Sequence, residues 1–494
     1  MTVTAAVRRP RGNPVQRHLV YFSYDPDARV DAASRYLLDA LREHVQHLAI
    51  VVNGTLGEES HAWASERADV VLERENVGFD VGAYRYAIDA LRDTHADADE
   101  LILANFTSFG PVGDLGEIFD RAALTDVDIW GLTAHGPLIP NPYTHRGVMP
   151  EHLQSHFLAV RRRVLESAAW REYWQTMPEI TSYSDSIQLH EARFTPWMRA
   201  RGFSVAALWE RPLRAGEQAS AANATIERPL ELLEAGYPLV KRRLAWHEPL
   251  ELDHRGSFVA ETFAAMAERG YPMELVLDAV RSASPRAVAT NLGWQLATDQ
   301  TPGEVLEATP WAGIVYPADL HPGRDLRGEA EDAAATARAA AEFLGPLDTL
   351  TLDTNPLRPH PHTLAVRPEL MAELDAHLER AGGLDHMATT LGWSATRCEE
   401  ALALLLPPLA LRRGLATLEV APAAAWAHAA QRAVTREQAL RDALPHGIRM
   451  PFAEARARAR GVLAPQRATV TLERTAPELA RRAKALIQSI RTPR

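Results

Sequence analysis

The stretch HLVYFSYDPDARVDAASRYLLDALREHVQHLAIVVN, residues 18–53, contains one complete unit of the pattern that organises the first half of the chain. Its two ends, 18–24 and 48–53, are short apolar runs with the length of buried strands. Between them, over 28–45, apolar residues recur every three to four positions, as on one face of an amphipathic helix. Two strands joined by such a helix predict a parallel pair within a sheet that helices cover.

Further apolar runs extend this pattern along the chain: VVLERE (70–75), ELILANF (100–106), DIWGLT (128–133), HFLAV (156–160) and FSVAAL (203–208). Together they predict an α/β domain, with a mostly parallel sheet and flanking helices, over residues 18–245. In such sheets ligands bind where the strands end at their carboxyl termini. We therefore expect the functional site in the loops after Tyr24, Asn53, Glu75 and Phe106.

The composition fits a globular protein of two or three domains. The chain has 494 residues, of which 46% are hydrophobic and 24% charged. A net charge of −11 argues against a general nucleic-acid binder, which needs basic residues to neutralise phosphates. The single cysteine, Cys398, can form no internal disulfide, and no cluster of Cys and His has the sequence spacing of a zinc site.

No part of the sequence predicts a membrane span or a secretory signal. The longest apolar run, 401–411, is short and contains Pro407 and Pro408. Residues 1–17 include four arginines but no apolar segment after them, so we expect a disordered basic lead-in rather than a signal peptide. These features predict a cytoplasmic protein, which could lie at the inner face of the cell membrane.

The region after residue 245 has a different texture, rich in proline and alanine. We expect a helical extension over 246–354, a proline- and histidine-rich linker over 355–367, and a helical C-terminal domain over 368–494. The helices expected in this half span 255–281, 329–345, 368–383, 394–413, 422–443 and 475–491. The last begins with Thr475 and Glu478 in capping-box spacing and is basic, which suggests peripheral contact with anionic lipid or a solvated terminal helix.

The stretch ERENVGFDVGAYRYAI, residues 73–88, leads from a strand into a helix through two glycines. Gly78 and Gly82 allow the backbone to approach a ligand closely, and the start of the helix favours a diphosphate. The alternative is a plain strand-to-helix turn that Asn76 or Asp80 caps.

A second stretch, ELILANFTSFGPVGDL (100–115), ends a buried strand in polar residues. Asn105 and Thr107 lie where sugar-nucleotide enzymes place metal-binding carboxylates, but they offer only an amide and a hydroxyl. The alternative is a polar strand terminus without a ligand.

The third candidate region spans 151–167 and 183–203. His152 and Gln154 alternate and would share one face of a strand. Glu191 and Asp185 lie in a helical stretch, where a carboxylate facing a cleft could deprotonate a sugar hydroxyl. A solvated helix carboxylate is the alternative for both.

Taken in order, six segments resemble the rhamnan synthesis protein F family. They are YDPDARVD (24–31), ENVGFDVGAYR (75–85), NFTSFGP (105–111), DIWGLT (128–133), HLQSHFL (152–158) and PLVKRR (238–243), and the resemblance covers about residues 18–275. It implies a glycosyltransferase that uses a nucleotide-sugar donor, such as dTDP-L-rhamnose, to build rhamnan, O-antigen or a similar cell-wall polymer. It also implies a lipid-linked or growing-glycan acceptor.

The wider order of motifs is similar to inverting transferases of the GT-A type, and this similarity implies roles for particular residues. Glu191, rather than Asp185, would be the general base. The donor would contact Asn53, Asn76, Gly78, Asp80, Asn105, Thr107, Lys241 and Arg242, with the last two offsetting diphosphate charge. Trp130, His152 and Gln154 would line the acceptor or sugar pocket.

At one point the chain departs from the family pattern. The family usually carries Asn-Asp-Ser at the end of the strand, where this chain has Asn105, Phe106 and Thr107. Because the carboxylate is missing, we expect weak Mg²⁺ or Mn²⁺ binding. The same departure leaves open a second function, that of a transferase-like scaffold or binding protein with little or no turnover.

Overall fold

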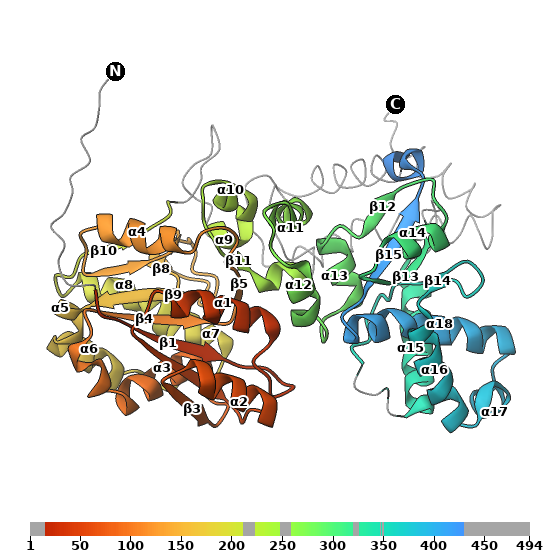
Figure 1. Cartoon of the computed structure of the whole chain (residues 1–494), viewed down its shortest axis with the longest axis horizontal. Helices are drawn as coiled ribbons and strands as arrows, with labels where there is room; N and C mark the ends of the chain where they lie inside the picture. The colour runs from red at the N-terminus through yellow and green to blue at the C-terminus, as the bar shows by residue number, and fades with distance from the viewer. Residues whose placement is uncertain are drawn as a thin grey trace, which may run out of the picture. The chain divides into compact units, whose positions relative to one another are not determined.

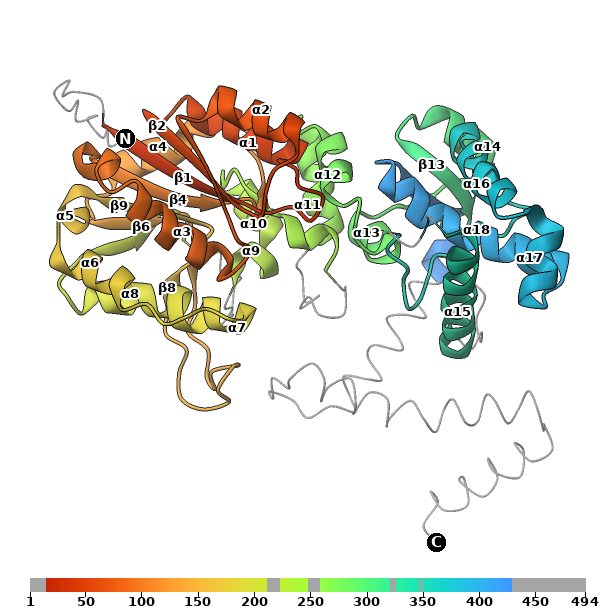
Figure 2. The same cartoon turned by 90° about the horizontal axis from the view of Figure 1, so that it is seen from below.

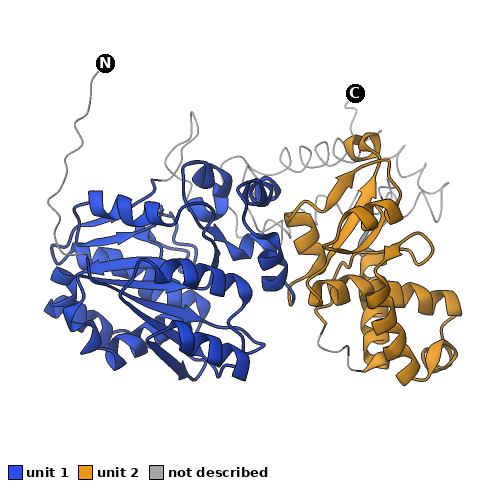
Figure 3. Ribbon diagram, in the orientation of Figure 1, with its two compact units in different colours: residues 1–281 blue, residues 282–494 orange. Residues whose placement is uncertain are grey.

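The computed structural model describes residues 15–210, 223–247, 258–319, 326–345, 347 and 350–428, and these form two compact units (Figure 3). The first unit ends at Arg281 and the second begins at Ser282. The helices α11 (Val259–Glu268) and α12 (Met273–Ala279), which follow the expected domain end at residue 245, belong to the first unit.

A seven-stranded sheet forms the centre of the first unit (Figure 1). Its strands lie in the order β10-β6-β9-β4-β1-β2-β3. Their bounds are β1 (Arg17–Ser23), β2 (His47–Asn53), β3 (Val70–Arg74), β4 (Glu100–Asn105), β6 (Ile129–Gly131), β9 (Phe157–Arg161) and β10 (Val205–Ala207). Only β9 is antiparallel to its neighbours. The predicted α/β fold with a mostly parallel sheet is therefore confirmed, and each of these strands overlaps a predicted one.

Helices cover both faces of this sheet (Figure 2). One face packs against α1 (Ala32–Arg42), α2 (Glu58–Arg67) and α4 (Gly116–Leu124). The other packs against α3 (Phe79–Ala90), α6 (Ala168–Gln175) and α8 (Ala192–Arg199). Shorter helical segments of this unit are α5 (Arg162–Leu165), α7 (Tyr183–Asp185), α9 (Ala224–Glu227), α10 (Pro229–Glu234) and the 3₁₀ turns η1 (Thr94–Asp97) and η3 (Arg242–Ala245).

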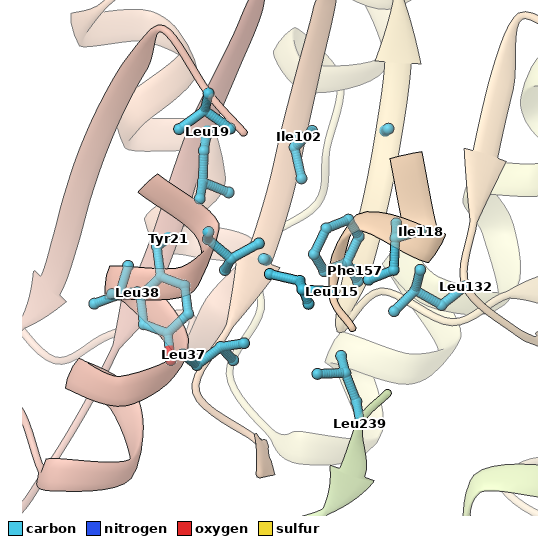
Figure 4. Close-up of a cluster of buried hydrophobic side chains, with 14 of the residues drawn as sticks. Leu19, Tyr21, Leu37, Leu38, Ile102, Leu115, Ile118, Leu132, Phe157 and Leu239 are labelled. Carbon is cyan, nitrogen blue, oxygen red and sulfur yellow. The ribbon is translucent and has the colours of Figure 1, made fainter. Parts of the chain in front are cut away.

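The two faces are built from alternate residues of the same strands. Leu19 and Tyr21 of β1 point into one core cluster, whereas Val20 and Phe22 point into the other. Figure 4 shows the first cluster, in which Tyr21 packs near Leu37 and Leu38 of α1. Helix α1 begins at Asp31, whose side chain accepts a hydrogen bond from the backbone N–H of Ser34 (2.8 Å). The strands are thus fixed by burial on both sides.

Two short antiparallel ladders lie outside the main sheet. The strand β5 (Ser108–Phe109) pairs with β11 (Val240–Lys241), and β7 (Ala134–His135) pairs with β8 (His152–Leu153). The first ladder brings residues 240–241 beside the loop that follows β4, which positions part of the candidate site.

The second unit combines helices with a four-stranded sheet of order β12-β15-β13-β14. The strands are β12 (Gln295–Ala297), β13 (Ala312–Pro317), β14 (Ala365–Val366) and β15 (Ala416–Ala421). The helices are α13 (Pro285–Asn291), α14 (Pro302–Ala308), α15 (Leu326–Leu344), α16 (Pro368–Arg380), α17 (Gly383–Leu391) and α18 (Ala395–Arg412). The mainly helical character is confirmed, but the sequence analysis does not predict the sheet, because its strands are short and each depends on partners far along the chain.

Helix α18 contains the longest apolar run of the sequence, residues 401–411. Pro407 and Pro408 lie buried inside this helix rather than ending it. Among the described residues, no helix is long and apolar enough to cross a membrane. Residues 1–14 of the expected lead-in, most of the expected helix 422–443, and the whole of 475–491 lie outside the described residues.

Candidate functional site

The order of the strands marks where a ligand would bind. Strand β1 lies between β2 and β4, so the chain order reverses direction across the sheet at this point. In open α/β sheets the crevice for ligands lies at such a switch point, beyond the carboxyl ends of the strands. Asn105 is the last residue of β4 and is buried there.

At this edge, four polar side chains from three segments form one hydrogen-bonded chain. Lys241 Nζ donates to Thr107 Oγ1 (3.0 Å), which in turn donates to Asn105 Oδ1 (2.6 Å). The amide nitrogen of Asn105 donates to Asp80 Oδ2 (3.1 Å). An ammonium and a carboxylate are thus linked through an amide and a hydroxyl, and we call this set the switch-point chain.

The β5–β11 ladder brings Lys241 to this edge, although Lys241 lies 134 residues after Thr107 in the sequence. Lys241 lies opposite Ser108 in the ladder, and the backbone N–H of Arg242 donates to the carbonyl of Thr107 (3.0 Å). Backbone pairing therefore sets the register, and the lysine side chain can reach Thr107.

Asp80 reaches the site from the first turn of α3. The helix is preceded by Gly78 in a left-handed conformation (φ +74°), and a Cβ on Gly82 would lie 2.9 Å from the carbonyl oxygen of Val77. Both positions require glycine because a side chain would strain or block this tight turn. The turn directs Asp80 inward, where one carboxylate oxygen accepts from Asn105 and the other from the N–H of Val81 (3.0 Å).

The charged groups at this edge shift one another's pKa values. Burial, reinforced by the charge of Glu191, raises the pKa of Asp80 to about 6. Burial lowers the pKa of Lys241 to about 8, although the charges of Glu191 and Asp80 oppose that change. At pH 7 both groups are therefore mostly ionised, yet each lies close to its titration range.

Glu191 lies at the same edge, at the end of a turn of π-helix, η2 (Ser186–Glu191). Such turns occur often at functional sites because they displace a side chain from the helical register. One oxygen of Glu191 accepts a hydrogen bond from the backbone N–H of Ser155 (3.1 Å). Because its charge contributes to the pKa shifts of Asp80 and Lys241, Glu191 lies within electrostatic range of the switch-point chain.

Three residues that were not predicted from the sequence, Tyr143, Tyr183 and Arg243, complete the surroundings of Glu191. Burial raises the pKa values of Tyr143, to about 12, and of Tyr183, with smaller contributions from Glu191. Arg243 donates to the hydroxyl of Tyr183 (3.4 Å). The run KRR over 241–243 was a signal for Arg243, but the sequence could not tell which arginine faces the site.

Arg242, expected at the donor, points into the protein core instead. Its guanidinium pairs with the buried carboxylate of Asp31 (2.6 Å) and donates to the hydroxyl of Ser34 (3.0 Å). The side chain is 3% exposed. Arg242 therefore stabilises the start of α1 and is not positioned to contact a ligand directly.

Asp185, the second candidate base, is used as a helix cap. Its carboxylate accepts hydrogen bonds from the N–H and hydroxyl of Thr181 and from the N–H of Ser182. These bonds lower the pKa of Asp185, those from Thr181 most strongly. They satisfy one carboxylate oxygen and give Asp185 a structural role at the start of α7.

Asn53 is the last residue of β2, and Asn76 lies in the turn between β3 and α3. Asn53 is buried, donates to the carbonyl of Phe79 (3.2 Å), and accepts from Arg74 (2.5 Å). Asn76 is exposed in the loop. Asn53 therefore braces the turn that carries Asp80.

The three residues expected to line the acceptor pocket, Trp130, His152 and Gln154, do not form one group. Trp130 is completely buried in the core, and its indole N–H donates to Glu100 (2.7 Å), so it cannot line an open pocket. His152 is buried and stacks on His135, with ring centroids 5.0 Å apart. Gln154 accepts from the hydroxyl of Thr133 (2.7 Å) and donates to Asn223 (3.2 Å).

Comparison with known proteins identifies a family. The family model for rhamnan synthesis protein F, RgpF, matches residues 48–305, which is more than half of the chain. An uncharacterized protein of Sinorhizobium fredii, y4gN, is 26% identical over 184 residues, covering 35% of this chain and 46% of that protein. The matched part of the chain thus spans less than half of that relative's length.

Solved structures show only a distant likeness. The bifunctional glycosyltransferase WbbM is 12% identical, with 54% of this chain and 52% of that chain covered and a TM-score of 0.27. A putative nucleotide-diphospho-sugar transferase from Desulfovibrio desulfuricans is 10% identical, with 52% and 98% covered and a TM-score of 0.24. At TM-scores this low, these likenesses carry no argument about function.

Proposed function

Because the chain belongs to the rhamnan synthesis protein F family, we propose that its first unit is a glycosyltransferase that uses a nucleotide-sugar donor. The donor is dTDP-L-rhamnose or a related deoxysugar nucleotide, and the acceptor is a growing cell-surface polysaccharide or a lipid-linked glycan. The observation that carries this proposal is the switch-point chain, with Glu191 within electrostatic range of it.

The donor would bind with its diphosphate beside Lys241 and Arg243. Both are cations on the same short segment, and a diphosphate needs positive charge close to its oxygens. Asn105 and Thr107 hold the ammonium of Lys241 in place through their hydrogen bonds. The positive charge is thereby positioned before the donor arrives, which lowers the cost of ordering it on binding.

Glu191 would act as the general base of an inverting transfer. It would accept the proton of an acceptor hydroxyl while that oxygen attacks the anomeric carbon of the sugar. The bond from this carbon to the diphosphate then breaks, and dTDP leaves with the electron pair. The hydrogen bond from Ser155 fixes one carboxylate oxygen and leaves the other for the acceptor.

The donor atoms at this edge fit a divalent metal ion poorly. The oxygen of Asn105 already accepts from the N–H and hydroxyl of Thr107, and a cation, Lys241, lies on that hydroxyl. Both carboxylate oxygens of Asp80 accept hydrogen bonds as well. We therefore propose that Lys241, rather than Mg²⁺ or Mn²⁺, provides most of the charge that offsets the diphosphate.

The direct test is a donor screen with the purified full-length chain. dTDP-L-rhamnose and other sugar nucleotides are tested for binding by calorimetry and for release of the nucleoside diphosphate when candidate acceptors are added, with and without EDTA. We expect saturable binding of a deoxysugar nucleotide, and release that EDTA does not abolish. Binding without release under all acceptors would favour the scaffold function, and no binding of any donor would contradict the proposal.

Contact with the membrane is a further part of this proposal. The basic segment 477–491 would be attracted to anionic lipid by roughly 1 kcal/mol for each basic residue near the surface. Co-sedimentation with phosphatidylserine-containing liposomes, compared between the whole chain and a deletion of 475–494, tests this directly. Equal co-sedimentation of the two would remove the idea.

A further inference from the structure

Three histidines meet at the amino ends of the central strands, opposite the carboxyl ends where the switch-point chain lies. His18 lies near the start of β1, and His47 is the first residue of β2, directly opposite His18 in the parallel ladder. His95 lies in η1, the turn that precedes β4. All three therefore lie at the amino ends of central strands.

The geometry of the three rings is compact. One ring nitrogen from each histidine can be chosen so that all three lie within 4.8 Å of one another, and no other group of three or more potential metal ligands of this kind occurs among the described residues. His18 Nδ1 and His95 Nδ1 are 3.1 Å apart. In a tetrahedral site with metal–nitrogen distances of about 2.0–2.1 Å, two ligand nitrogens lie roughly 3.3 Å apart. The pair from His18 and His95 already has nearly this separation.

The polar atoms of this cluster are incompletely satisfied. His47 Nδ1 and His95 Nε2 are buried and have no hydrogen-bond partner. Buried polar atoms in native proteins almost always have a partner, so the unpartnered nitrogen of His47 points to a missing ligand.

We propose that His18, His47 and His95 bind a divalent transition-metal ion such as Zn²⁺, at a site separate from the one that binds the sugar donor. Three imidazole nitrogens suit Zn²⁺ and its neighbours among the transition metals, whereas Mg²⁺ and Ca²⁺ prefer oxygen ligands. Solvent takes the fourth position. The nitrogen of His47 needs to approach its partners by at most about 1.5 Å.

The surroundings support such a site. His18 Nε2 lies 3.7 Å from a carboxylate oxygen of Asp97, and ligand histidines commonly direct their second nitrogen to a carboxylate in this way. His95 is also part of the wall of a cavity of about 380 Å³, which is bordered by Arg92, Ala96 and Leu101 among others.

The site would stabilise the fold rather than take part in sugar transfer. The ion would join β1, β2 and the turn before β4, which are separate segments of the chain. Because the unfolded chain has no preformed site, the free energy of binding adds to the free energy of unfolding.

The experiment uses the full-length protein stripped of metal, with Zn²⁺ titrated by calorimetry and Co²⁺ as a spectroscopic probe. His47→Gln is the main variant because His47 is the most exposed of the three, and His61→Gln, a histidine exposed on α2, is the matched control. We expect one Zn²⁺ per chain, a rise in Tm with Zn²⁺, and tetrahedral Co²⁺ absorption. Even loss of a residue that only orients a metal ligand typically weakens metal binding about 10–100-fold, so His47→Gln should cost at least about 10-fold.

The control should bind Zn²⁺ as the unchanged protein does. Asp97→Asn provides a second variant that leaves all three ligands in place, and it should weaken binding less than His47→Gln. Absence of saturable Zn²⁺ binding, or binding that His47→Gln leaves unchanged, would overturn the proposal. Neither result depends on whether the protein transfers a sugar.

Discussion

The two ends of the strands in the seven-stranded sheet carry different kinds of polar chemistry. We call them the carboxyl edge and the amino edge. At the carboxyl edge, ionised groups of opposite sign, Asp80 and Lys241, have pKa values of about 6 and about 8 and are linked through Asn105 and Thr107. At the amino edge, three histidines gather, and a carboxylate oxygen of Asp97 lies 3.7 Å from His18 Nε2. One edge is therefore suited to charged substrates and proton transfer, and the other to neutral nitrogen ligands.

The two edges also differ in how they are assembled. His18 and His47 face one another because adjacent parallel strands begin in register. Lys241 and Thr107, by contrast, meet only because the β5–β11 ladder joins segments 134 residues apart in sequence. The carboxyl edge thus depends on long-range pairing. Substitutions of its residues, measured by turnover, donor binding and unfolding, should show which residues act in function and which in folding.

The largest expected effect is on turnover, from Glu191→Gln. Loss of a positioned general base typically lowers the rate by about 10²–10⁴-fold. Because glutamine keeps the size and accepts the hydrogen bond from Ser155, donor affinity should persist. Steady-state release of nucleoside diphosphate, with donor binding measured in parallel, checks the expectation.

Asp185→Asn is the matched control, since this carboxylate lies six residues earlier and caps α7. Its turnover should fall much less than that of the Glu191 variant. If the control is inactive while Glu191→Gln turns over normally, the assignment of the base passes to Asp185.

The next effect is on stability, from Asp31→Ala beneath the carboxyl edge. The change leaves the buried guanidinium of Arg242 unpaired, and breaking such a pair typically lowers the free energy of unfolding by about 3–5 kcal/mol. Asp89→Ala, which breaks an exposed pair with Arg92, should cost about 1 kcal/mol or less. Urea unfolding of both variants measures the difference, and equal costs would show that the buried pair contributes little.

The pH dependence of the Asp31–Arg242 pair has a definite sign. Burial alone would raise the pKa of Asp31, but the charge and hydrogen bond of Arg242 hold it below its usual value. A carboxylate with a lowered folded pKa stabilises the protein above its unfolded pKa of about 3.9. This contribution should disappear as the pH falls below about 4, and the Asp31→Ala variant should lack that part of the acid transition.

A smaller effect on affinity is expected from Lys241→Met. Hydrogen bonds to charged groups contribute about 1.5–3 kcal/mol, so donor binding should weaken roughly 10–150-fold. Arg163→Met removes an exposed cation near the other end of the sheet and should leave donor affinity unchanged. Donor binding that tolerates Lys241→Met but requires Mn²⁺ would show that a metal ion, and not the lysine, holds the diphosphate.

The smallest effect has the opposite direction. Because the pKa of Asp80 is about 6 in the folded protein and about 3.9 in the unfolded chain, stability falls as the pH rises from about 4 to 6 and falls no further above that range. Asp80→Asn removes that cost. We expect stability to rise by about 1 kcal/mol at pH 7.5, a value reduced for partial solvent exposure, with little or no gain at about pH 3.5, below the unfolded pKa.

Urea unfolding at the two pH values tests this prediction. Asp185→Asn should show no such gain, because hydrogen bonds lower rather than raise the pKa of that carboxyl. A loss of stability at both pH values for Asp80→Asn would mean that the ionised carboxylate stabilises this edge.

The sequence alone determined the seven strands of the main sheet, helices α1 and α3, and the end of the strands at which to look for a site. Apolar runs such as 48–53 and the amphipathic pattern of 28–45 are local signals, and they match β2 (His47–Asn53) and α1 (Ala32–Arg42). Asp80 and Asn105 were candidates because they follow strands that end at one edge of the sheet. The two glycines within 73–88 similarly predicted the tight turn before α3.

Tertiary structure decided which of these residues meet. The pairing of β5 with β11, each two residues long, has no local signal, yet it directs Lys241 to Thr107 and Arg242 to the core. Glu191 and Asp185 look alike in sequence until the π-helical turn and the helix cap give them different surroundings. The histidines at 18, 47 and 95 have no zinc-site spacing, because strand register, and not distance along the chain, brings them together.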